Sequence, residues 1–443
     1  MKLALILLPV LALASASPQN AGCRNCETID EFAMEFGDIV IDEDEKAKRA
    51  KALMDNEDAI RKHNEEFRHG DSNYYMKLNP LSDLPADEEE EQKLGLINVP
   101  VDEFSRGAYP LPLDSYDRSS ESLLAQVRQN VQAPSAFFVD DNLRTPVKNQ
   151  QQCGSCAAFA TVAAVETCML KSGANLQGLD LSEQSLLDCA YNPSNYANGC
   201  HGASIGAYST FLASNLDGKL PHELVDPYLN TNPRLQCPNE PSFNTGAKVT
   251  QKIVSYGCDE ATMEKLIVQY GMVITSLFAG NHTETAVQSG FSNYGGGVFD
   301  GCPSKFSSRR NVNHAVTVVG YGEENGVKYW IMRNSWGKQW GMNGYMKIKR
   351  GVNMCAIGHE CTVPICSTDS AQLSPIPPPP PPSPSCDVSA RYVITGLYNW
   401  TFRGVTTPIR CTNGICELRA GIMTGNFLCE QLCGSESPKC WDP

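Results

Sequence analysis

The sequence is centred on residues 146–159, which read PVKNQQQCGSCAAF. Residues 157–170 are mostly apolar and compatible with a helix, so Cys156 is predicted to stand at a helix start. The unpaired N–H groups and the positive dipole end at such a position favour the thiolate, which is the nucleophilic form of cysteine. Gln150 can offer a side-chain N–H to an oxyanion, beside the N–H of Cys156. Taken alone, Cys156 could equally be an inert buried thiol or half of a disulfide.

Two later stretches can complete such a site. Residues 311–322, NVNHAVTVVGYG, place His314 at the head of an apolar strand, and residues 328–337, KYWIMRNSWG, end a second strand at Asn334. Amide hydrolysis through a thiol needs a group that protonates the leaving amine and another that orients this group. His314 and Asn334 can take these two roles, although a histidine in an apolar strand is more commonly a satisfied core residue.

These stretches resemble the active-site segments of the papain family of cysteine peptidases. Residues 181–189, LSEQSLLDC, and residues 199–203, GCHGA, resemble two further segments of that family. The resemblance implies an α+β fold of two subdomains, a helical half with Cys156 and a β-barrel-like half with His314 and Asn334. It also implies a cysteine endopeptidase that works through an acyl-enzyme, with Gln150 in the oxyanion hole and with no metal or other cofactor.

Two substitutions depart from the family pattern. Ala157 stands where the family has Trp or Tyr, and Ala203 replaces a Gly whose backbone pairs with the substrate. We expect the first to loosen the site, and the second to crowd the substrate or to be tolerated. A catalytically impaired homologue that binds peptides is therefore an alternative, and so is a processing peptidase targeted by its C-terminal module.

The resemblance also implies residues that bind the substrate and residues that form disulfides. The expected substrate-binding residues are Gly154, Gly202, Ala203, Ser276, Ala315, Trp336 and Glu360. Glu360 would let the second subsite accept Arg as well as apolar side chains, the alternative being an exposed loop residue without a role. The implied disulfides are Cys153–Cys200, Cys189–Cys237 and Cys302–Cys355, and the pairing of Cys168, Cys258, Cys361 and Cys366 stays open.

The first part of the chain predicts a long amphipathic helix over residues 42–68, where charged helix formers dominate. One stripe of that helix holds Glu45, Arg49, Leu53, Asn56, Ile60 and Asn64. Together with residues 77–83, KLNPLSD, this stripe resembles the propeptide motifs of papain-like enzymes. The resemblance implies that residues 17–131 form an inhibitory propeptide whose tail runs backwards through the cleft. The acidic run 88–91 favours a solvated loop, with the hypothesis that its protonation in acid loosens the propeptide.

Residues 132–371 are then the peptidase domain, in which Phe138 could fill a position that holds Trp in the family. Residues 247–298 read as β-rich with turns, and residues 271–277 have the pattern of a buried strand. Residues 372–385 are rich in Pro and favour a polyproline II linker. Residues 386–443 hold six Cys and predict a small disulfide-rich domain of unknown ligand, with an adhesion or carbohydrate-binding module as one reading.

Composition and the N-terminus indicate the compartment. The 443 residues include 19 Cys and carry a net charge of −14, which fits an oxidising route and argues against nucleic acid or anionic membrane as a partner. Residues 1–16 have the pattern of a signal peptide, and no apolar run is long enough for a membrane span. We expect a monomer in the secretory pathway, extracellular or lysosomal/vacuolar, that acts on protein or peptide substrates. Asn281 and Asn399 are candidate glycosylation sites, and Cys23 and Cys26 a candidate disulfide.

Overall fold

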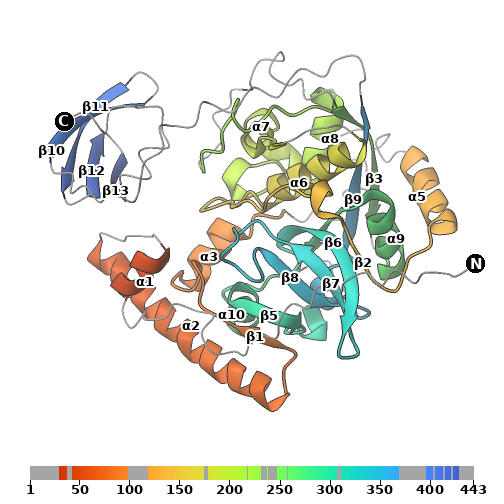
Figure 1. Ribbon diagram of the computed structural model, residues 1–443, viewed down its shortest axis with the longest axis horizontal. Helices are drawn as coiled ribbons and strands as arrows, with labels where there is room; N and C mark the ends of the chain where they lie inside the picture. The colour runs from red at the N-terminus through yellow and green to blue at the C-terminus, as the bar shows by residue number, and fades with distance from the viewer. Residues whose placement is uncertain are drawn as a thin grey trace, which may run out of the picture. The chain divides into compact units, whose positions relative to one another are not determined.

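The computed structural model describes residues 29–36, 42–97, 118–173, 178–216, 218–230, 237, 247–256, 258–306 and 311–368, and four strands between 396 and 428 (Figure 1). The chain divides into two compact units, residues 1–374 and 375–443. The expected signal peptide, the Cys23–Cys26 pair and the Pro-rich stretch lie outside the described residues. Among the helices that are described, none is long and apolar enough to cross a membrane.

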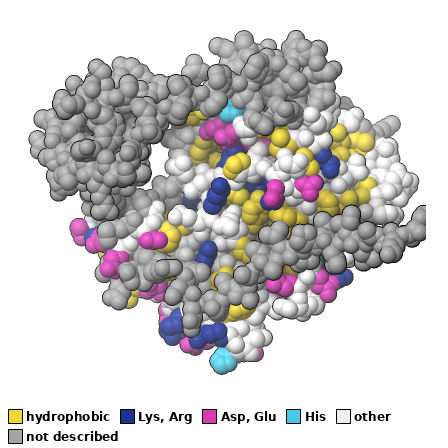
Figure 2. Space-filling view, viewed as in Figure 1, with side chains coloured by type: hydrophobic (Ala, Val, Ile, Leu, Met, Phe, Trp, Pro, Cys, Tyr) yellow, Lys and Arg dark blue, Asp and Glu magenta, His cyan; other side chains and the backbone are white. Residues whose placement is uncertain are grey.

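The long helix expected over residues 42–68 is α2 (Glu43–His69). It begins where the side chain of Asp42 accepts a hydrogen bond from the backbone of Glu45 at 2.9 Å, and it ends at Gly70 in the left-handed conformation. Its outer surface is charged, with ion pairs such as Lys62–Asp58 at 2.6 Å. Figure 2 shows acidic and basic side chains close together on the described part of one face of the molecule.

The stripe predicted along α2 faces the rest of the first unit. Arg49 is buried and bonds Glu45 at 3.0 Å and Asp83 at 3.1 Å. Leu53 packs against Phe32 of α1 (Ile29–Phe36), and Asn64 exchanges two hydrogen bonds with the backbone of Met76. Losing one partner of a buried ion pair leaves a charge without compensation, at a cost of about 3–5 kcal/mol. The stripe therefore holds α2 to the segment that follows it.

The segment that follows α2 connects to the main sheet. Strand β1 (Tyr74–Met76) pairs antiparallel with β5 (Tyr294–Phe299), and α2 lies beside α10 (Thr285–Ser292) (Figure 1). Asn56 of α2 accepts hydrogen bonds from Ser289 and Asn293, each at 2.9 Å. The residues predicted to form a propeptide are thus joined to α10 and to the edge of the sheet by side chains and by backbone pairing.

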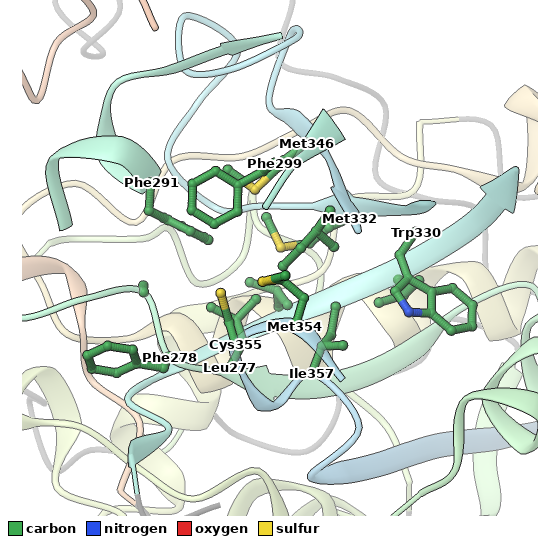
Figure 3. Close-up of a cluster of buried hydrophobic side chains, with 14 of the residues drawn as sticks. Leu277, Phe278, Phe291, Phe299, Trp330, Met332, Met346, Met354, Cys355 and Ile357 are labelled. Atoms are coloured by element: carbon green, nitrogen blue, oxygen red, sulfur yellow. The ribbon is translucent and has the colours of Figure 1, made fainter. Parts of the chain in front are cut away.

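The main sheet has nine strands in the described residues, in the order β1-β5-β8-β7-β6-β4-β9-β3, with β2 paired to β6. Its other strands are β2 (Phe137–Phe138), β3 (Ala247–Tyr256), β4 (Val273–Leu277), β6 (His314–Glu324), β7 (Val327–Arg333), β8 (Tyr345–Lys349) and β9 (Glu360–Thr368). The buried strand expected over residues 271–277 is β4. Beside this sheet lies a core with Phe291, Phe299, Trp330 and Met346, and Figure 3 shows these side chains in the buried cluster, the first from α10 and the others from strands of the sheet.

The helical half is built on α6 (Cys156–Lys171), with α7 (Glu183–Cys189) and α8 (Ile205–Asn215) packed on it. Ser182 caps α7 through the backbone of Ser185 at 3.0 Å, as the sequence indicates. The three implied disulfides, Cys153–Cys200, Cys189–Cys237 and Cys302–Cys355, are present. The pairing left open is Cys168–Cys366 and Cys258–Cys361.

Residues 247–298 are not all strand and turn. They include α9 (Glu260–Tyr270), capped by Asp259, and α10, in addition to β3, β4 and β5. The prediction of a β-rich segment missed these helices because short apolar runs do not distinguish a buried helix from a strand. Phe138, offered for a Trp position, is 44% exposed, and Arg144 stacks on its ring at 4.2 Å.

The acidic run is not a solvated loop. Residues 88–91 lie in α3 (Ala86–Lys93), and Glu89 is buried with its carboxylate bonded to the hydroxyl of Ser292. Burial raises the pKa of Glu89 to about 7, while the hydrogen bond from Ser292 and the charge of Lys93 act in the opposite direction. One member of the run thus joins α3 to the last residue of α10.

The second unit contains one antiparallel sheet, in which β10 (Gly396–Phe402), β11 (Val405–Thr412), β12 (Ile415–Ala420) and β13 (Met423–Leu428) pair in chain order. Asn399 lies in β10, and Cys411 is in register with Cys416 across β11 and β12. The remaining four cysteines of the expected C-terminal domain, Cys386, Cys429, Cys433 and Cys440, lie outside the described residues.

Candidate active site

Cys156 is the first residue of α6, as the sequence predicts. Its side chain is fully buried, and it is a free thiol, so the reading as half of a disulfide is wrong. The disulfide from Cys153 to Cys200 ties the loop before it to the short 3-10 helix Gly199–His201. The backbone N–H of Ala315 points at the sulfur of Cys156, with the two atoms 3.4 Å apart.

His314 and Asn334 come from neighbouring strands of the other half. His314 opens β6, and Asn334 directly follows β7, which pairs with β6. Nε2 of His314 donates a hydrogen bond to Oδ1 of Asn334 at 2.8 Å. Nδ1 is buried and makes no hydrogen bond of good geometry within the described residues, although the ring also interacts with the backbone of Lys93. The ring of Trp336 lies 4.8 Å from the imidazole and shields this pair.

Gln150 is held by the residue that follows Asn334. Its backbone N–H donates to the carbonyl of Ser335 at 2.8 Å, and its Oε1 accepts from the Ser335 hydroxyl at 2.6 Å. This leaves Nε2 to donate to the carbonyls of Cys153, at 2.9 Å, and Lys93, at 3.2 Å. Ser335 was not predicted as a site residue, although it directly follows Asn334 in the sequence.

Residues 93–97, within the predicted propeptide, cross the site. The carbonyl of Lys93 occupies the side-chain donor of Gln150, and the backbone N–H of Gly95 hydrogen-bonds the sulfur of Cys156. An N–H group at the sulfur presents no carbonyl carbon for attack. A Cβ atom on Gly95 would lie 1.7 Å from the carbonyl oxygen of Gly154, so this crossing requires glycine.

The same segment pairs with Ala203. The N–H of Ala203 donates to the carbonyl of Gly95 at 2.8 Å, and its carbonyl accepts from Ile97 at 3.1 Å. Leu96 and Ala203 form a parallel bridge. The methyl group that replaces glycine at position 203 therefore leaves the main chain free to pair with an extended peptide, and next to it Gly202 lies against the carbonyl of Gly95.

Burial sets the protonation of both reacting groups in this form of the chain. It raises the pKa of the Cys156 thiol to about 11, although backbone N–H groups of Ala315 and Gly95 act in the opposite direction. It lowers the pKa of His314 to about 4, while the hydrogen bonds that the ring makes to Asn334 and to the backbone of Lys93 act in the opposite direction. With the propeptide in place, thiol and imidazole are both neutral at neutral pH.

Three of the expected substrate-binding residues form a row across the sheet. Ser276 of β4 pairs with Ala315 of β6. Ile274 pairs with Thr362 of β9, so Ser276 and Glu360 stand in the same antiparallel register. Glu360 is buried rather than an exposed loop residue, and its carboxylate accepts from the hydroxyl of Thr362 at 3.0 Å. The Ser276 hydroxyl is buried without a hydrogen-bond partner among the described residues.

Comparisons with known proteins agree with this geometry. Residues 135–365 match the family model described as papain family cysteine protease. Cathepsin L2 of Homo sapiens is 31% identical, with 69% of this chain and 82% of that protein covered. Digestive cysteine proteinase 1 of Homarus americanus is 29% identical over 82% of this chain and 99% of that protein. The solved structure of digestive procathepsin L2 proteinase from Tenebrio molitor larval midgut has a TM-score of 0.62 and 27% identity, covering 76% of this chain and 98% of that one.

Proposed function

Since the chain belongs to the papain family of cysteine proteases and is a cysteine endopeptidase made as a zymogen, we propose that Cys156 is its nucleophile and His314 its proton carrier. The observation that carries this proposal is the meeting of the two halves, with the His314–Asn334 bond on one side and the sulfur of Cys156 against Ala315 on the other. The alternative of an impaired peptide-binding homologue is not favoured, because the complete set of reacting groups is present.

The reaction proceeds in two steps, acylation and deacylation. The Cys156 thiolate attacks the scissile carbonyl carbon, and the resulting oxyanion accepts hydrogen bonds from Gln150 Nε2 and the N–H of Cys156. The C–N bond breaks as the protonated His314 gives its proton to the leaving amine, which leaves a thioester. A water molecule then attacks the thioester, with Nδ1 of His314 taking its proton, and the acid departs as the thiolate re-forms. Asn334 keeps the ring oriented throughout.

The propeptide inhibits the enzyme within the same chain. We place it at residues 17–131 and the peptidase domain at 132–371, with residues 93–97 as the inhibiting segment. Its contacts support this, because they occupy the donor of Gln150 and bury the thiol. The sequence predicts a thiolate at Cys156. On this proposal the thiolate, with a protonated His314 beside it, forms only in the open cleft, when water returns to both groups.

The row Ala315, Ser276 and Glu360 supports a second subsite that accepts a basic residue. It begins beside the nucleophile, through Ala315, and it ends at a buried carboxylate. A guanidinium placed there could pair with Glu360 and offer a proton to the free hydroxyl of Ser276. Substrates would therefore carry Arg or an apolar residue second before the scissile bond.

One experiment tests both proposals. The activated enzyme is assayed on two fluorogenic peptides with Arg before the scissile bond, preceded by Phe in one and by Arg in the other. Hydrolysis of both, lost in Cys156→Ser, is expected, and Glu360→Gln should selectively reduce the rate on the Arg-Arg peptide. Activity that survives Cys156→Ser would contradict the nucleophile. An equal loss on both peptides in Glu360→Gln would contradict the subsite alone.

We place the enzyme in the secretory pathway, outside the cell or in a lysosome or vacuole, on the signal-like N-terminus and the five disulfides among the described residues. Residues 386–443 are proposed as a separate disulfide-rich domain after the Pro-rich linker, with a ligand to be identified. Asn281 is proposed to carry a glycan, since it is partly exposed in the loop before α10.

A further inference from the structure

The backbone around the oxyanion donor is held from both halves of the enzyme. On the sheet side, Ser335 binds the N–H and the side-chain oxygen of Gln150. On the helical side, the hydroxyl of Tyr228 donates to the carbonyl of Gln150 at 2.7 Å. The same hydroxyl lies 2.9 Å from Oγ of Ser155, the residue directly before the nucleophile. One phenol thus touches both chain segments that supply the oxyanion hole.

The direction of these bonds follows from the proton count. A tyrosine hydroxyl has one proton, and here it goes to the carbonyl of Gln150, so toward Ser155 the Tyr228 oxygen can only accept. The Ser155 hydroxyl, which also has one proton, shares it between Tyr228 at 2.9 Å and the carbonyl of Cys153 at 3.3 Å. The Cys153 carbonyl completes the network, because it accepts from Nε2 of Gln150 at 2.9 Å. The distance between the side-chain donor and the N–H of Cys156 therefore depends on this short network.

Tyr228 is itself fixed. Its ring meets the ring of Phe159 edge to face at 4.9 Å, on the first turn of α6. Its backbone N–H donates to Glu223 at 2.6 Å, and the next N–H, of Leu229, donates to Gln184 of α7 at 3.0 Å. The hydroxyl is thus presented by a rigid loop, which is what positioning another group requires.

We propose that Tyr228 is a positioning residue for the oxyanion hole, whose hydroxyl sets the spacing between the Gln150 amide and the N–H of Cys156. The inference rests on the proposed role of Gln150 as an oxyanion donor. Tyr228 is not proposed to touch the substrate, so its effect on kcat must pass through Gln150. No signal in the sequence pointed to this residue.

The test compares Tyr228→Phe with Gln150→Ala, the double variant and Tyr321→Phe, each in the activated enzyme. Tyr321 is the matched control, since its buried hydroxyl also donates to a backbone carbonyl, that of Pro134 at 3.0 Å. Tyr228→Phe should lower kcat about fivefold at unchanged KM, the effect of one ordinary hydrogen bond. Gln150→Ala should lower kcat by about 100- to 1,000-fold, and adding Tyr228→Phe should then cause no further loss.

Two inhibitors separate positioning from general damage. A peptide aldehyde forms a tetrahedral adduct that uses the oxyanion hole, so its affinity should fall in Tyr228→Phe by the same factor as kcat. Iodoacetamide alkylates the thiol without that hole, so its rate with Cys156 should not change. Unchanged kcat in Tyr228→Phe, an additive loss in the double variant, or a matching fall in alkylation would each overturn the proposal.

Two further results separate a failure of the Tyr228 proposal from a failure of the oxyanion role of Gln150. If Gln150→Ala alone leaves kcat intact, the proposed oxyanion role fails, and the inference about Tyr228 fails with it. If Tyr228→Phe lowers the melting temperature too far for assay, Ser155→Ala removes the second contact of the same hydroxyl. That variant should lower kcat by a smaller factor, and the loss should again vanish in the Gln150→Ala background.

Discussion

At the scale of single residues, Ala157 shows how a family position can change with its surroundings. Its side chain is fully buried on the first turn of α6, so an indole there would displace packed neighbours. We expect Ala157→Trp to destabilise the protein by about 1–3 kcal/mol, although the family pattern has an aromatic residue at this position. Thermal unfolding measures this, with Ala47→Trp on the exposed side of α2 as the control. A stabilised Ala157→Trp would show that the site has room for the ring.

Gly95 is a second position where a single added atom matters, because a Cβ there would decide whether residues 93–97 fit in the cleft. A side chain there would collide with the carbonyl of Gly154, so Gly95→Ala should push residues 93–97 away from the cleft. We expect faster activation of the zymogen and a measurable rate on a fluorogenic peptide before propeptide removal. The control is Glu91→Ala, an exposed change four residues earlier. Equal activation rates in the two variants would mean that residues 93–97 can shift and still block the cleft.

At the scale of elements, the stability of the α3 contact depends on pH in the opposite sense to that expected from an acidic run. Because burial raises the pKa of Glu89 to about 7, docking of α3 favours the protonated carboxyl. This contribution is fully present below the pKa of a free Glu, about 4.3, and is lost as the pH rises through about 7. Acid therefore strengthens this contact, which is the opposite of the hypothesis that protonation of the acidic run loosens the propeptide.

The variant Glu89→Gln tests that sign. A neutral amide can still accept from Ser292, so the variant should be more stable than the parent at pH 7 and equally stable at about pH 4. Melting temperatures are measured in the Cys156→Ser background, in which the chain does not process itself. Glu91→Gln is the matched control, exposed on the same helix. A gain for Glu89→Gln at pH 4 instead of pH 7 would reverse the assignment.

At the scale of the whole molecule, the propeptide and the enzyme share one sheet and one buried site, so inhibition and thiol chemistry are linked. The raised pKa of Cys156, about 11, and the lowered pKa of His314, about 4, keep both groups neutral between these values. We expect the intact zymogen to react slowly with iodoacetamide from about pH 5 to pH 8 and to gain rate only in stronger alkali. Removal of the propeptide should make alkylation fast at neutral pH.

Two comparisons check this linkage. Mass spectrometry of the alkylated chain identifies which thiol is modified. The label expected on Cys156 of the parent should be absent from the Cys156→Ser variant. Gly95→Ala should alkylate faster than the parent before any cleavage, since its cleft is partly uncovered. A zymogen that is labelled as fast as the activated enzyme would show that the propeptide does not bury the sulfur in solution.

Much of the fold could be predicted because its signals are local. The helix over residues 42–68 follows from composition and periodicity. The start of α6, the head of β6 and the end of β7 follow from short apolar runs with polar residues at their ends. The helices α9 and α10 were missed because brief apolar segments have the same pattern in either structure. Helix α3 was missed since charge alone says nothing about which residue is buried.

The sequence by itself determined the candidates for the reacting groups, because Cys156, His314, Asn334 and Gln150 stand in stretches that resemble the active-site segments of the papain family. Only the tertiary structure decided what holds and silences them. Ser335 and Tyr228 reach Gln150 from chain segments 185 and 78 residues away, and the carbonyl of Lys93 covers it from a third. Contacts between distant segments leave no periodic pattern in the chain, and the burial that shifts the pKa of Cys156 exists only once those segments have packed.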